Sequence, residues 1–378
     1  MRVALISSII PADTTGGELI LYRHLVKEKP FDLTIVDGSP KARANASSTN
    51  RILARLQKSR LAPFIEDCWA FRRGHWLDAK CKKLCNQSFD CVLTVAHGDA
   101  FCAAQRFAKS QNLPLVSIYH DWWPDIPHLH AAGRRALERQ FFELARDSRC
   151  NLCVCEGMKE ALGQPAKSTI LYPIPDSAPF AGLSLNRAKS SPFRIGYMGN
   201  LFDYGPMLQA LIEESWNHPE VKIEVRGTNP EWPAEFRKQA KERGNWLSYA
   251  PRHELKNWLE QLDAFLVTMS FDPKLRRRME TSFPSKLTEF AIYGKPIIIW
   301  GPSYCSAVKW AKIHQVGVLI ETELGMAAFD TIKKCTSECK INQEGIYQFI
   351  NPITNSLNDI VIQKTFVEVL SQTKIRYL

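Results

Sequence analysis

Short apolar runs alternate with helix-length amphipathic segments along the whole chain, and they do so in two successive sets. Runs that are short and apolar on both faces are typical of parallel strands buried between layers of helices. The runs of the first set are residues 3–10, 33–36, 91–95, 115–119, 152–155 and 169–172, and those of the second are 193–198, 221–226, 246–249, 264–269, 296–300 and 317–320. The pattern therefore predicts an α/β protein made of two doubly wound, Rossmann-like domains with parallel sheets.

The proline-rich segment 173–192 separates the two sets. A chain of 378 residues is long enough for two such domains, and we place the first at residues 1–180 and the second at residues 190–354. Residues 355–378 have a helical pattern after the last strand. Ligands of open parallel sheets bind beyond the carboxyl ends of the strands, so we expect a site in the loops that follow strands.

Composition and cysteine usage narrow the class of protein. Hydrophobic residues make up 45% and charged residues 23% of the chain, which is typical of a globular protein. No apolar run approaches the ~20 residues of a membrane-spanning helix, and no signal-peptide pattern follows the first run. Eleven cysteines, an odd number, do not indicate a disulfide framework. Cys150, Cys153 and Cys155 lack the further partners of a zinc site. These features predict a cytoplasmic protein with reduced thiols.

Most of the formal net charge of +10 lies in one segment. Residues 41–83 contain eleven Lys and Arg side chains against three acidic ones, with apolar and aromatic residues between them. Such a segment suits anionic lipid headgroups or a nucleic-acid backbone. The simpler alternative is that these charges are the solvated faces of two ordinary helices.

Loops after strands of the first domain carry candidate chemistry. The first strand leads through Gly16 and Gly17 into a helix expected at about residues 17–27. Paired glycines let the backbone approach a ligand closely, and a helix start favours an anion. A plain tight turn gives the same sequence, so this signal by itself leaves both alternatives open.

The fourth strand ends in His120-Asp-Trp-Trp123, and the third ends in His97-Gly-Asp99. Histidine can donate to a phosphate or hydroxyl, carboxylates accept from sugar hydroxyls, and indole rings suit the apolar face of a sugar. The alternative is a histidine bonded to nearby backbone, with the tryptophans serving as packing.

Residues 279–296 predict a loop, a helix that begins near Pro284 or Ser285, a glycine stop and a strand. Lys286 and Glu289 are three positions apart and therefore share one face near the helix start. Beside a cleft, Glu289 is suited to bind the hydroxyls of a ribose; elsewhere it is an ordinary surface carboxylate.

The segment Phe283-Pro-Ser-Lys-Leu-Thr-Glu-Phe-Ala-Ile-Tyr-Gly-Lys-Pro296 resembles the donor-nucleotide helix of GT-B retaining glycosyltransferases, particularly sequence family 4. Other stretches resemble further parts of that family in the right order: residues 11–17 its glycine-rich first loop, 119–121 its His-Asp strand end, 196–200 the strand and loop that open its second domain, and 249–255 with 263–267 the segment before the donor helix. The likeness covers most of the chain, although only the donor-helix element is fairly specific by itself.

The resemblance implies a GT-B fold of two facing domains with an interdomain cleft. The activity it implies is transfer of a sugar from a nucleotide-sugar to a glycan, lipid-linked or small-molecule acceptor, with retention of configuration. The first domain would hold the acceptor, and residues 355–378 would pack back on it. No metal or cofactor is expected, because cationic side chains and helix N-termini can neutralise the departing diphosphate. No nucleic-acid partner is expected; the basic segment 41–83 would dock the acceptor domain on the inner face of an anionic membrane or guide an anionic acceptor.

The resemblance also implies roles for individual residues in three groups. His120, Asp121 and Gly17 would act at the reacting centre. The donor would contact Gly16, Gly17, Gly199, Asn200, Arg278, Ser285, Lys286 and Glu289, and the acceptor would contact His97, Asp99, Trp122 and Trp123.

Two departures from the family pattern fall on donor chemistry. The residue eight positions before Glu289 is Thr281, where members usually have a second Glu, and Glu280 lies one place away. The loop after Gly199 lacks the usual Arg and Lys, so the nearest cations in sequence are residues 276–278 and Lys286. Two further hypotheses therefore stay open. One is another GT-B enzyme, such as a nucleotide-sugar epimerase or an inverting transferase, and the other is a non-catalytic protein that binds acidic lipid or RNA.

Overall fold

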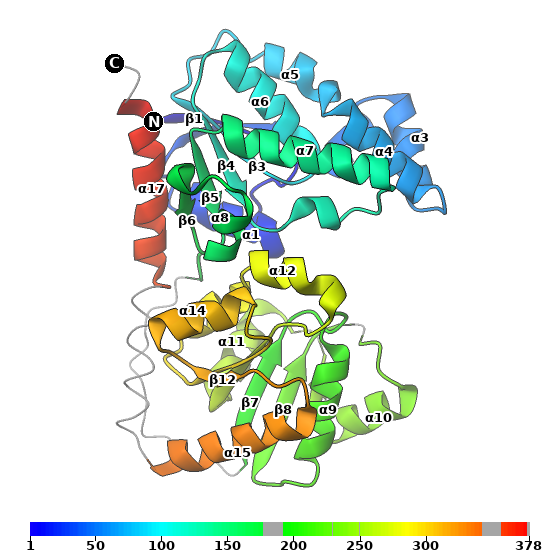
Figure 1. Ribbon diagram of the computed structural model, residues 1–378, viewed down its shortest axis with the longest axis vertical. Coiled ribbons are helices and arrows are strands. Elements are labelled where there is room, and N and C mark those ends of the chain that lie inside the picture. Colours follow the sequence, from blue (N-terminus) through cyan, green and yellow to red (C-terminus); the bar gives the residue numbers. More distant parts are fainter. Residues whose placement is uncertain (177–191, 229, 249, 342–356, 376–378) are drawn as a thin grey trace. The chain divides into compact units, whose positions relative to one another are not determined.

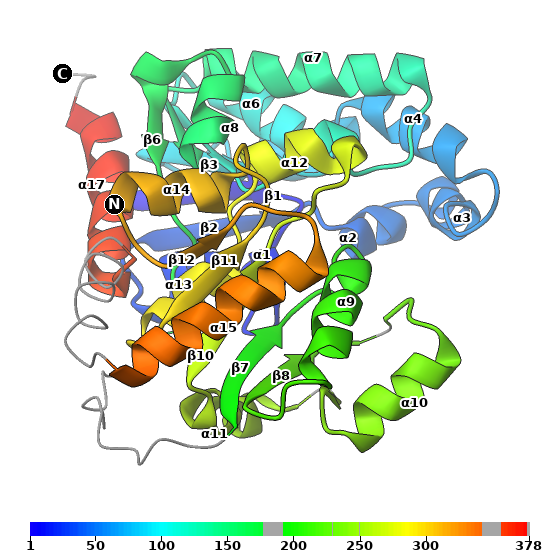
Figure 2. The ribbon, with the colours of Figure 1, turned by 60° about the horizontal axis from the view of Figure 1, so that its bottom comes forward.

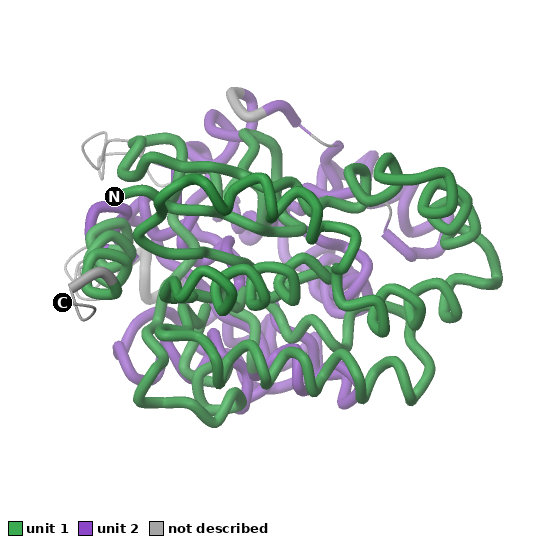
Figure 3. The backbone as a smooth tube through the Cα atoms, turned by 90° about the horizontal axis from the view of Figure 1, so that it is seen from above, with its two compact units in different colours: residues 1–174, 281–283, 362–378 green, residues 175–280, 284–361 purple. Residues whose placement is uncertain are grey.

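The computed structural model describes residues 1–176, 192–228, 230–248, 250–341 and 357–375. The chain forms two compact units, coloured separately in Figure 3. Unit 1 comprises Met1–Ile174, Thr281–Phe283 and Ile362–Leu378, and unit 2 comprises Pro175–Glu280 and Pro284–Val361. Most of the segment expected to separate the domains, residues 177–191, lies outside the described residues.

Each unit contains one six-stranded parallel sheet, which confirms the predicted fold class (Figure 1). The strands of unit 1 are β1 (Arg2–Ser7), β2 (Asp32–Asp37), β3 (Cys91–Val95), β4 (Leu115–Tyr119), β5 (Cys150–Cys153) and β6 (Ser168–Ile170). Those of unit 2 are β7 (Phe193–Met198), β8 (Val221–Arg226), β9 (Trp246–Leu247), β10 (Ala264–Thr268), β11 (Ile297–Trp300) and β12 (Val318–Ile320). All twelve predicted strands therefore form, with shifted ends: β1 stops at Ser7, and Cys155 lies beyond β5 as the N-cap residue of the next helix. Tyr249, the expected end of β9, lies outside the described residues.

The strand orders place a switch point in each sheet. The first sheet has the order β2-β1-β3-β4-β5-β6. The chain adds β2 on one side of β1 and then continues on the other side from β3, so the switch point lies between β1 and β3. The second has the order β12-β11-β10-β7-β8-β9, so its switch point lies between β7 and β10. Because ligands of doubly wound sheets bind beyond the carboxyl ends of the strands at such points, the loops after these strands are the first place to look for a site.

Helices cover both faces of the first sheet. On one face, Leu21 and Leu25 from the N-terminal helical segment pack with Ile362, Phe366 and Leu370 from the C-terminal helix against the strands. The helices of this face are α1 (Gly16–Tyr22), which continues as a π-helical turn (Arg23–Lys27), and α17 (Asp359–Ile375); those associated with the other face are α6 (Ala100–Ser110), α7 (Ala131–Asp147) and α8 (Glu156–Ala161).

A helical insert occupies the connection from β2 to β3. It consists of α2 (Pro40–Asn45), α3 (Ser48–Leu56), α4 (Ala62–Arg72), a 3₁₀ turn (His75–Leu77) and α5 (Asp78–Lys82). The hydroxyls of Ser39 and Ser47 accept hydrogen bonds from the first turns of α2 and α3, which fixes where these helices begin. In unit 2 the equivalent stretch between β8 and β10 contains the edge strand β9 between two helices.

In unit 2, α9 (Gly205–Ser215) and α15 (Gly325–Ile341) lie side by side and cover one face of the sheet (Figure 2). Leu208, Leu211, Phe329 and Ile332 carry this packing. The remaining helices are α10 (Ala234–Glu242), α11 (Arg252–Gln261), α12 (Arg276–Thr281), α13 (Ser285–Ala291) and α14 (Ser306–His314). Among the described residues, no helix is both long and apolar enough to cross a membrane.

Candidate functional site

The loops after β1 and β3 meet at the switch point of unit 1. The amide of Ala100 donates to Ser8 Oγ at 3.3 Å, which ties the two loops together. Gly98 has φ +68°, and a Cβ there would lie 2.2 Å from Ser8 Oγ. Only glycine fits, because both the backbone conformation and the space exclude a side chain. Sequence analysis gave Ser8 and Gly98 no role, although Gly98 sits inside the His-Gly-Asp motif.

His97 lies at the same edge of the sheet and stacks on Trp123, which follows β4. Their ring centroids are 3.7 Å apart with a 39° tilt. Burial lowers the pKa of His97 to about 4, and the neighbouring His120 adds to this, while Asp121 opposes it. The structure therefore brings together His97 and Trp123, which were predicted to contact the acceptor, as a flat surface with a neutral imidazole at neutral pH.

His120 follows β4 directly, and its side chain is partly buried. Its Nε2 is inaccessible to water and has no hydrogen-bond partner among the described residues. Burial lowers the pKa of His120, and Asp121 raises it in part. A neutral imidazole with an unsatisfied ring nitrogen is suited to form a hydrogen bond with a ligand hydroxyl.

Asp121 is held by a residue that is distant in sequence. Ser282 Oγ donates to Asp121 Oδ1 at 2.8 Å, and 161 positions separate the two residues. Ser282 belongs to the three-residue segment Thr281–Phe283, which is part of unit 1 although its flanking helices α12 and α13 belong to unit 2. In the same segment the Phe283 ring lies 4.9 Å from that of Tyr172. Ser282 carries no signal in the sequence, because no local pattern marks a pairing over this separation.

Asp99 and Trp122, which were predicted to contact the acceptor, are buried inside unit 1. Asp99 is 4% exposed, and its carboxylate faces Arg43 at 3.5 Å and accepts from Trp76 Nε1 at 3.0 Å. Burial raises the pKa of Asp99, and Arg43 opposes the shift. Trp122 is also 4% exposed and packs against Phe141. Both side chains are engaged inside unit 1, so we leave them out of the proposed site.

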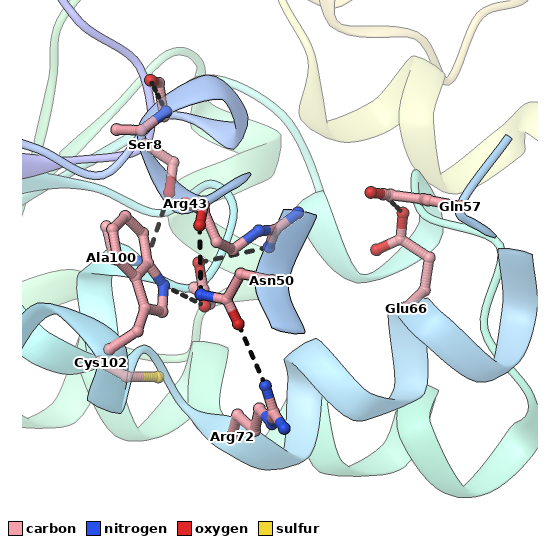
Figure 4. A network of polar contacts seen from close by, with 12 residues as sticks. Ser8, Arg43, Asn50, Gln57, Glu66, Arg72, Ala100 and Cys102 are labelled. Atoms are coloured by element: carbon pink, nitrogen blue, oxygen red, sulfur yellow. Dashed lines mark hydrogen bonds and ion pairs between the residues drawn. The ribbon is translucent and has the colours of Figure 1, made fainter. Parts of the chain in front are cut away.

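The contacts of Arg43 show that the basic segment 41–83 is not simply a set of solvated helix faces. Asn50 donates to the Arg43 carbonyl at 3.1 Å and accepts from Arg72 Nη1 at 3.3 Å (Figure 4). Arg43 also lies over the Trp69 ring, 4.1 Å from its centroid. Arg43 is therefore a buried structural cation and not part of a surface charge.

Gly16 and Gly17 begin α1, as the sequence predicts. Gly16 has φ +61°, which favours glycine, and a Cβ at this position would meet nothing within 4 Å. A Cβ on Gly17 would lie 3.3 Å from Ile9 Cδ1. The loop is closed locally by a hydrogen bond from Thr14 Oγ1 to Glu18 Oε2.

At the switch point of unit 2, the loop after β7 begins with Gly199, whose φ is +147°. Tyr197 Oη donates to the Asn200 carbonyl, and Asn200 Nδ2 donates to Asp203 Oδ2, both at 2.7 Å. A Cβ on Gly227 would lie 2.5 Å from the Gly199 carbonyl oxygen, so the neighbouring strand end needs glycine too. The loop is thus held in one conformation with its backbone accessible to close approach.

Two cations from distant segments lie at this loop, although the loop itself lacks Arg and Lys. Lys286 Cε is 3.8 Å from the position of a Cβ on Gly199. Arg278 Nη1 donates to Asp203 Oδ2 at 3.0 Å. Glu289 lies one turn along α13 from Lys286, and its Oε2 accepts from the Asp176 amide at 3.4 Å. The structure therefore brings Arg278 and Lys286 to the loop that contains Gly199 and Asn200, while Ser285 is the first residue of α13 and Glu289 lies further along that helix.

Other candidates for the missing charges are engaged differently. Arg276 Nε donates to Glu280 Oε1 at 2.9 Å, and its guanidinium lies over the Tyr304 ring. Glu280, the carboxylate one place from the expected position, is thus paired on α12. Among the described residues, no group of three or more His, Cys, Asp or Glu could hold a metal ion.

Comparison with solved structures identifies the architecture. The chain superposes on HepE from Anabaena, solved in complex with UDP, with a TM-score of 0.66 at 13% identity over 98% of this chain and 100% of that one. A glycosyltransferase from Rickettsia africae gives a TM-score of 0.64 at 12% identity, covering 99% and 98% of the two chains. The fold is GT-B.

An α,α-trehalose 6-phosphate synthase from Burkholderia multivorans extends the GT-B likeness, with a TM-score of 0.61 at 10% identity over 98% of this chain and 96% of that one. No protein-family model matches the sequence, and no curated protein matches it either. At these identities the GT-B likeness describes the fold, and the chemistry has to be argued from the residues.

Proposed function

We propose that this protein is a glycosyltransferase that takes a sugar from a nucleotide-sugar. The observation that supports this most directly is the presence of Lys286 and Arg278 at the Gly199 loop of unit 2, with Glu289 one turn along α13 from Lys286. Cations beside a glycine loop suit a diphosphate, and a carboxylate one helical turn away suits the hydroxyls of a ribose. HepE, with the same fold, has been solved with UDP and with UDP-glucose, which favours a uridine donor.

In this proposal Lys286 and Arg278 bind the diphosphate and replace the cations that the loop lacks. Arg278 is suited to this role because its side chain is 42% exposed, and its contact with Asp203 uses one of several donors of the guanidinium. Both cations stabilise the charge that develops on the leaving phosphate, so the reaction is proposed to proceed without a metal.

Unit 1 supplies the other substrate surface in this proposal. The acceptor stacks on Trp123 and His97, while Gly16 and Gly17 lie against the donor diphosphate and sugar. His120 offers a neutral imidazole to a sugar hydroxyl, and Asp121, fixed by Ser282, orients that imidazole. The anomeric configuration is retained, with the acceptor proton passing to the leaving phosphate.

The donor site is tested by thermal shift with UDP and UDP-sugars, followed by a turnover assay that detects released UDP. We expect UDP to raise the melting temperature and Glu289→Ala to remove that shift, because the ribose contacts are lost. Glu321→Ala is the matched control. Glu321 is also a carboxylate of unit 2, but it pairs with Lys312 and has no part in the proposed site. No stabilisation by any nucleoside diphosphate would overturn the proposal.

Analysis of the product separates this activity from related ones. A single α- or β-linked product with the donor's configuration supports a retaining transferase. Product of opposite configuration indicates an inverting transferase, and formation of an epimeric sugar without any acceptor indicates an epimerase of the same fold.

A second proposal is that unit 1 docks on an anionic membrane through the α3–α4 hairpin. Exposed apolar side chains gather there beside cations that form no ion pair with any described residue. The apolar members are Ile52, Leu56, Leu61 and Phe64, and the cations are Arg51, Arg55, Lys58 and Arg60. Apolar side chains mixed with cations suit the boundary between headgroups and acyl chains.

The structure also changes which residues test the membrane proposal. Arg72 and Arg73, the natural choices from sequence, are held by Asn50 and Glu143, so reversing their charge would break contacts inside unit 1. We expect Arg55→Glu combined with Phe64→Ser to weaken sedimentation with phosphatidylglycerol vesicles by about tenfold. The control Lys82→Glu with Lys83→Glu should have a smaller effect, and equal losses would return the hairpin to an ordinary solvated surface.

A further inference from the structure

A groove between α4 and α7 in unit 1 has a chemistry that none of the roles above uses. The two helices pack against each other, and the hollow beside their contact has a volume of about 530 Å³. We call it the α4–α7 groove; its lining residues are Phe71, Arg73, Ala132, Arg135, Ala136, Arg139 and Gln140. Three of these are arginines.

Two of the three guanidinium groups have no ion-pair partner in the part of the chain that the structure describes. Arg135 and Arg139 form no ion pair with any residue that the structure describes. They are four positions apart on α7 and therefore adjacent on its surface, where like charges destabilise a helix. Arg73 pairs with Glu143 at 2.8 Å, but its side chain stays 42% exposed. Glu143 therefore neutralises only part of the positive charge that the three arginines bring to the groove.

The backbone at Arg73 is held in an unusual conformation. Its φ is +50°, in the left-handed region that costs energy for a residue with a side chain. Arg106 Nη1 donates to the Arg73 carbonyl at 2.7 Å and fixes the residue there. Gly74, the next residue, also has a positive φ, +67°. Arg73 lines the groove from the end of α4.

The rest of the lining is built for a compact ligand. Ala132 and Ala136 leave space on the α7 side. Gln140 forms a fixed end, because its Nε2 donates to the Ala70 carbonyl at 2.9 Å and its Oε1 accepts from Cys102 Sγ at 3.3 Å. Phe71 is 57% exposed and gives the rim an apolar edge.

We propose that the α4–α7 groove binds a phosphate group, either of a lipid headgroup or of a soluble phosphate ester. A phosphate presents oxygens that planar guanidinium groups contact in pairs, and its negative charge matches the excess charge of Arg135 and Arg139. The apolar rim at Phe71 suits an acyl chain or other apolar part next to the phosphate. This inference does not depend on glycosyl transfer.

The test uses the full chain and the double variant Arg135→Gln with Arg139→Gln, compared with Lys82→Gln and Lys83→Gln. The control removes the same charge from exposed residues outside the groove. Inorganic pyrophosphate titrated by calorimetry is the soluble probe, and phosphatidylcholine vesicles with and without phosphatidic acid are the lipid probe. We expect the groove variant to weaken binding of at least one probe by about tenfold or more, and the control by much less.

The outcomes separate the possible ligands. Loss of pyrophosphate binding in the groove variant assigns a soluble phosphate ester, and loss confined to phosphatidic acid vesicles assigns a lipid headgroup. Equal losses in both variants, or no binding of either probe by the unmodified protein, would overturn the proposal. UDP stabilisation is measured on the same samples. Stabilisation by UDP should be the same in both variants as in the unmodified protein. If UDP does not stabilise the unmodified protein, that result counts against the proposed transferase and not against the phosphate site.

Discussion

The switch points of the two sheets offer opposite kinds of surface. In unit 1, His97 and His120 are partly buried, and burial lowers the pKa of both, so their imidazoles are neutral at neutral pH. In unit 2, Lys286 and Arg278 bring cations to the Gly199 loop, and Glu289 lies one turn along α13 from Lys286. The same doubly wound plan thus presents neutral rings that suit hydroxyl groups in one unit and charged side chains in the other. This difference is why we place the acceptor on unit 1 and the charged nucleotide on unit 2.

The largest expected effect is on kcat, and it tests whether unit 1 and unit 2 have separate roles. His120→Ala should lower kcat by about a thousandfold, because it removes a group that acts on the reacting sugar. UDP should still stabilise the variant, since the side chains proposed to hold its diphosphate and ribose belong to unit 2. Single-turnover rates and thermal shifts measure the two properties, with His128→Ala as the exposed control in the same loop region. Loss of UDP stabilisation together with turnover would break the proposed division of roles.

A second prediction compares a buried ion pair of unit 1 with an exposed one of unit 2. Arg43→Met should lower the free energy of unfolding by about 3 kcal/mol, because it leaves the Asp99 carboxylate buried without its cation. Lys312→Met breaks an ion pair with Glu321 in which the lysine side chain is 48% exposed, and should cost less than about 1 kcal/mol. Urea unfolding measures both. Similar values would contradict the view that unit 1 relies on buried charges.

A third prediction concerns the pH dependence of stability. The pKa of His97 is about 4 in the folded protein, against an ordinary value of 6.5. The unfolded chain therefore binds more protons between these values, and the contribution of His97 is full above pH 6.5 and lost as the pH falls through 4.

Replacing His97 should reduce this dependence. In His97→Gln, the fall in unfolding free energy between neutral pH and pH 4 should be smaller by about 3 kcal/mol. His128→Gln, at an exposed position, is the control substitution. Urea titrations across the pH range provide the measurement, and an unchanged profile in His97→Gln would show that His97 is hydrated and not buried.

The smallest effect concerns the bond between Ser282 and Asp121. Ser282→Ala should lower kcat by about tenfold, because Asp121 loses the donor that orients it. Ser282→Thr keeps a hydroxyl and should retain most of the activity. UDP binding should be the same in both variants. If alanine and threonine behave alike, the hydrogen bond has no role in positioning Asp121.

The sequence located the strands and the helix at Ser285–Ala291 well because those features depend on neighbours within a few residues. Apolar runs, proline and glycine punctuation and the three-residue spacing of Lys286 and Glu289 are local signals. The sequence did not show that Asp99 and Trp122 are buried, because the side chains that cover them, including Arg43 and Phe141, come from other elements. A polar residue after a strand looks the same whether it faces a ligand or a partner inside the fold.

The amino-acid sequence alone therefore determined two parallel α/β sheets, the positions of their strand-end loops and the location of the excess charge. Only the tertiary structure decided which charges are exposed. It paired Arg43 with Asp99, brought Ser282 to Asp121 and Arg278 to the Gly199 loop, and placed Arg135 and Arg139 beside a hollow without an ion pair to any described residue. The physical reason is range: periodicity and turns act over a few residues, whereas burial and ion pairing depend on segments that folding brings together across long stretches of chain.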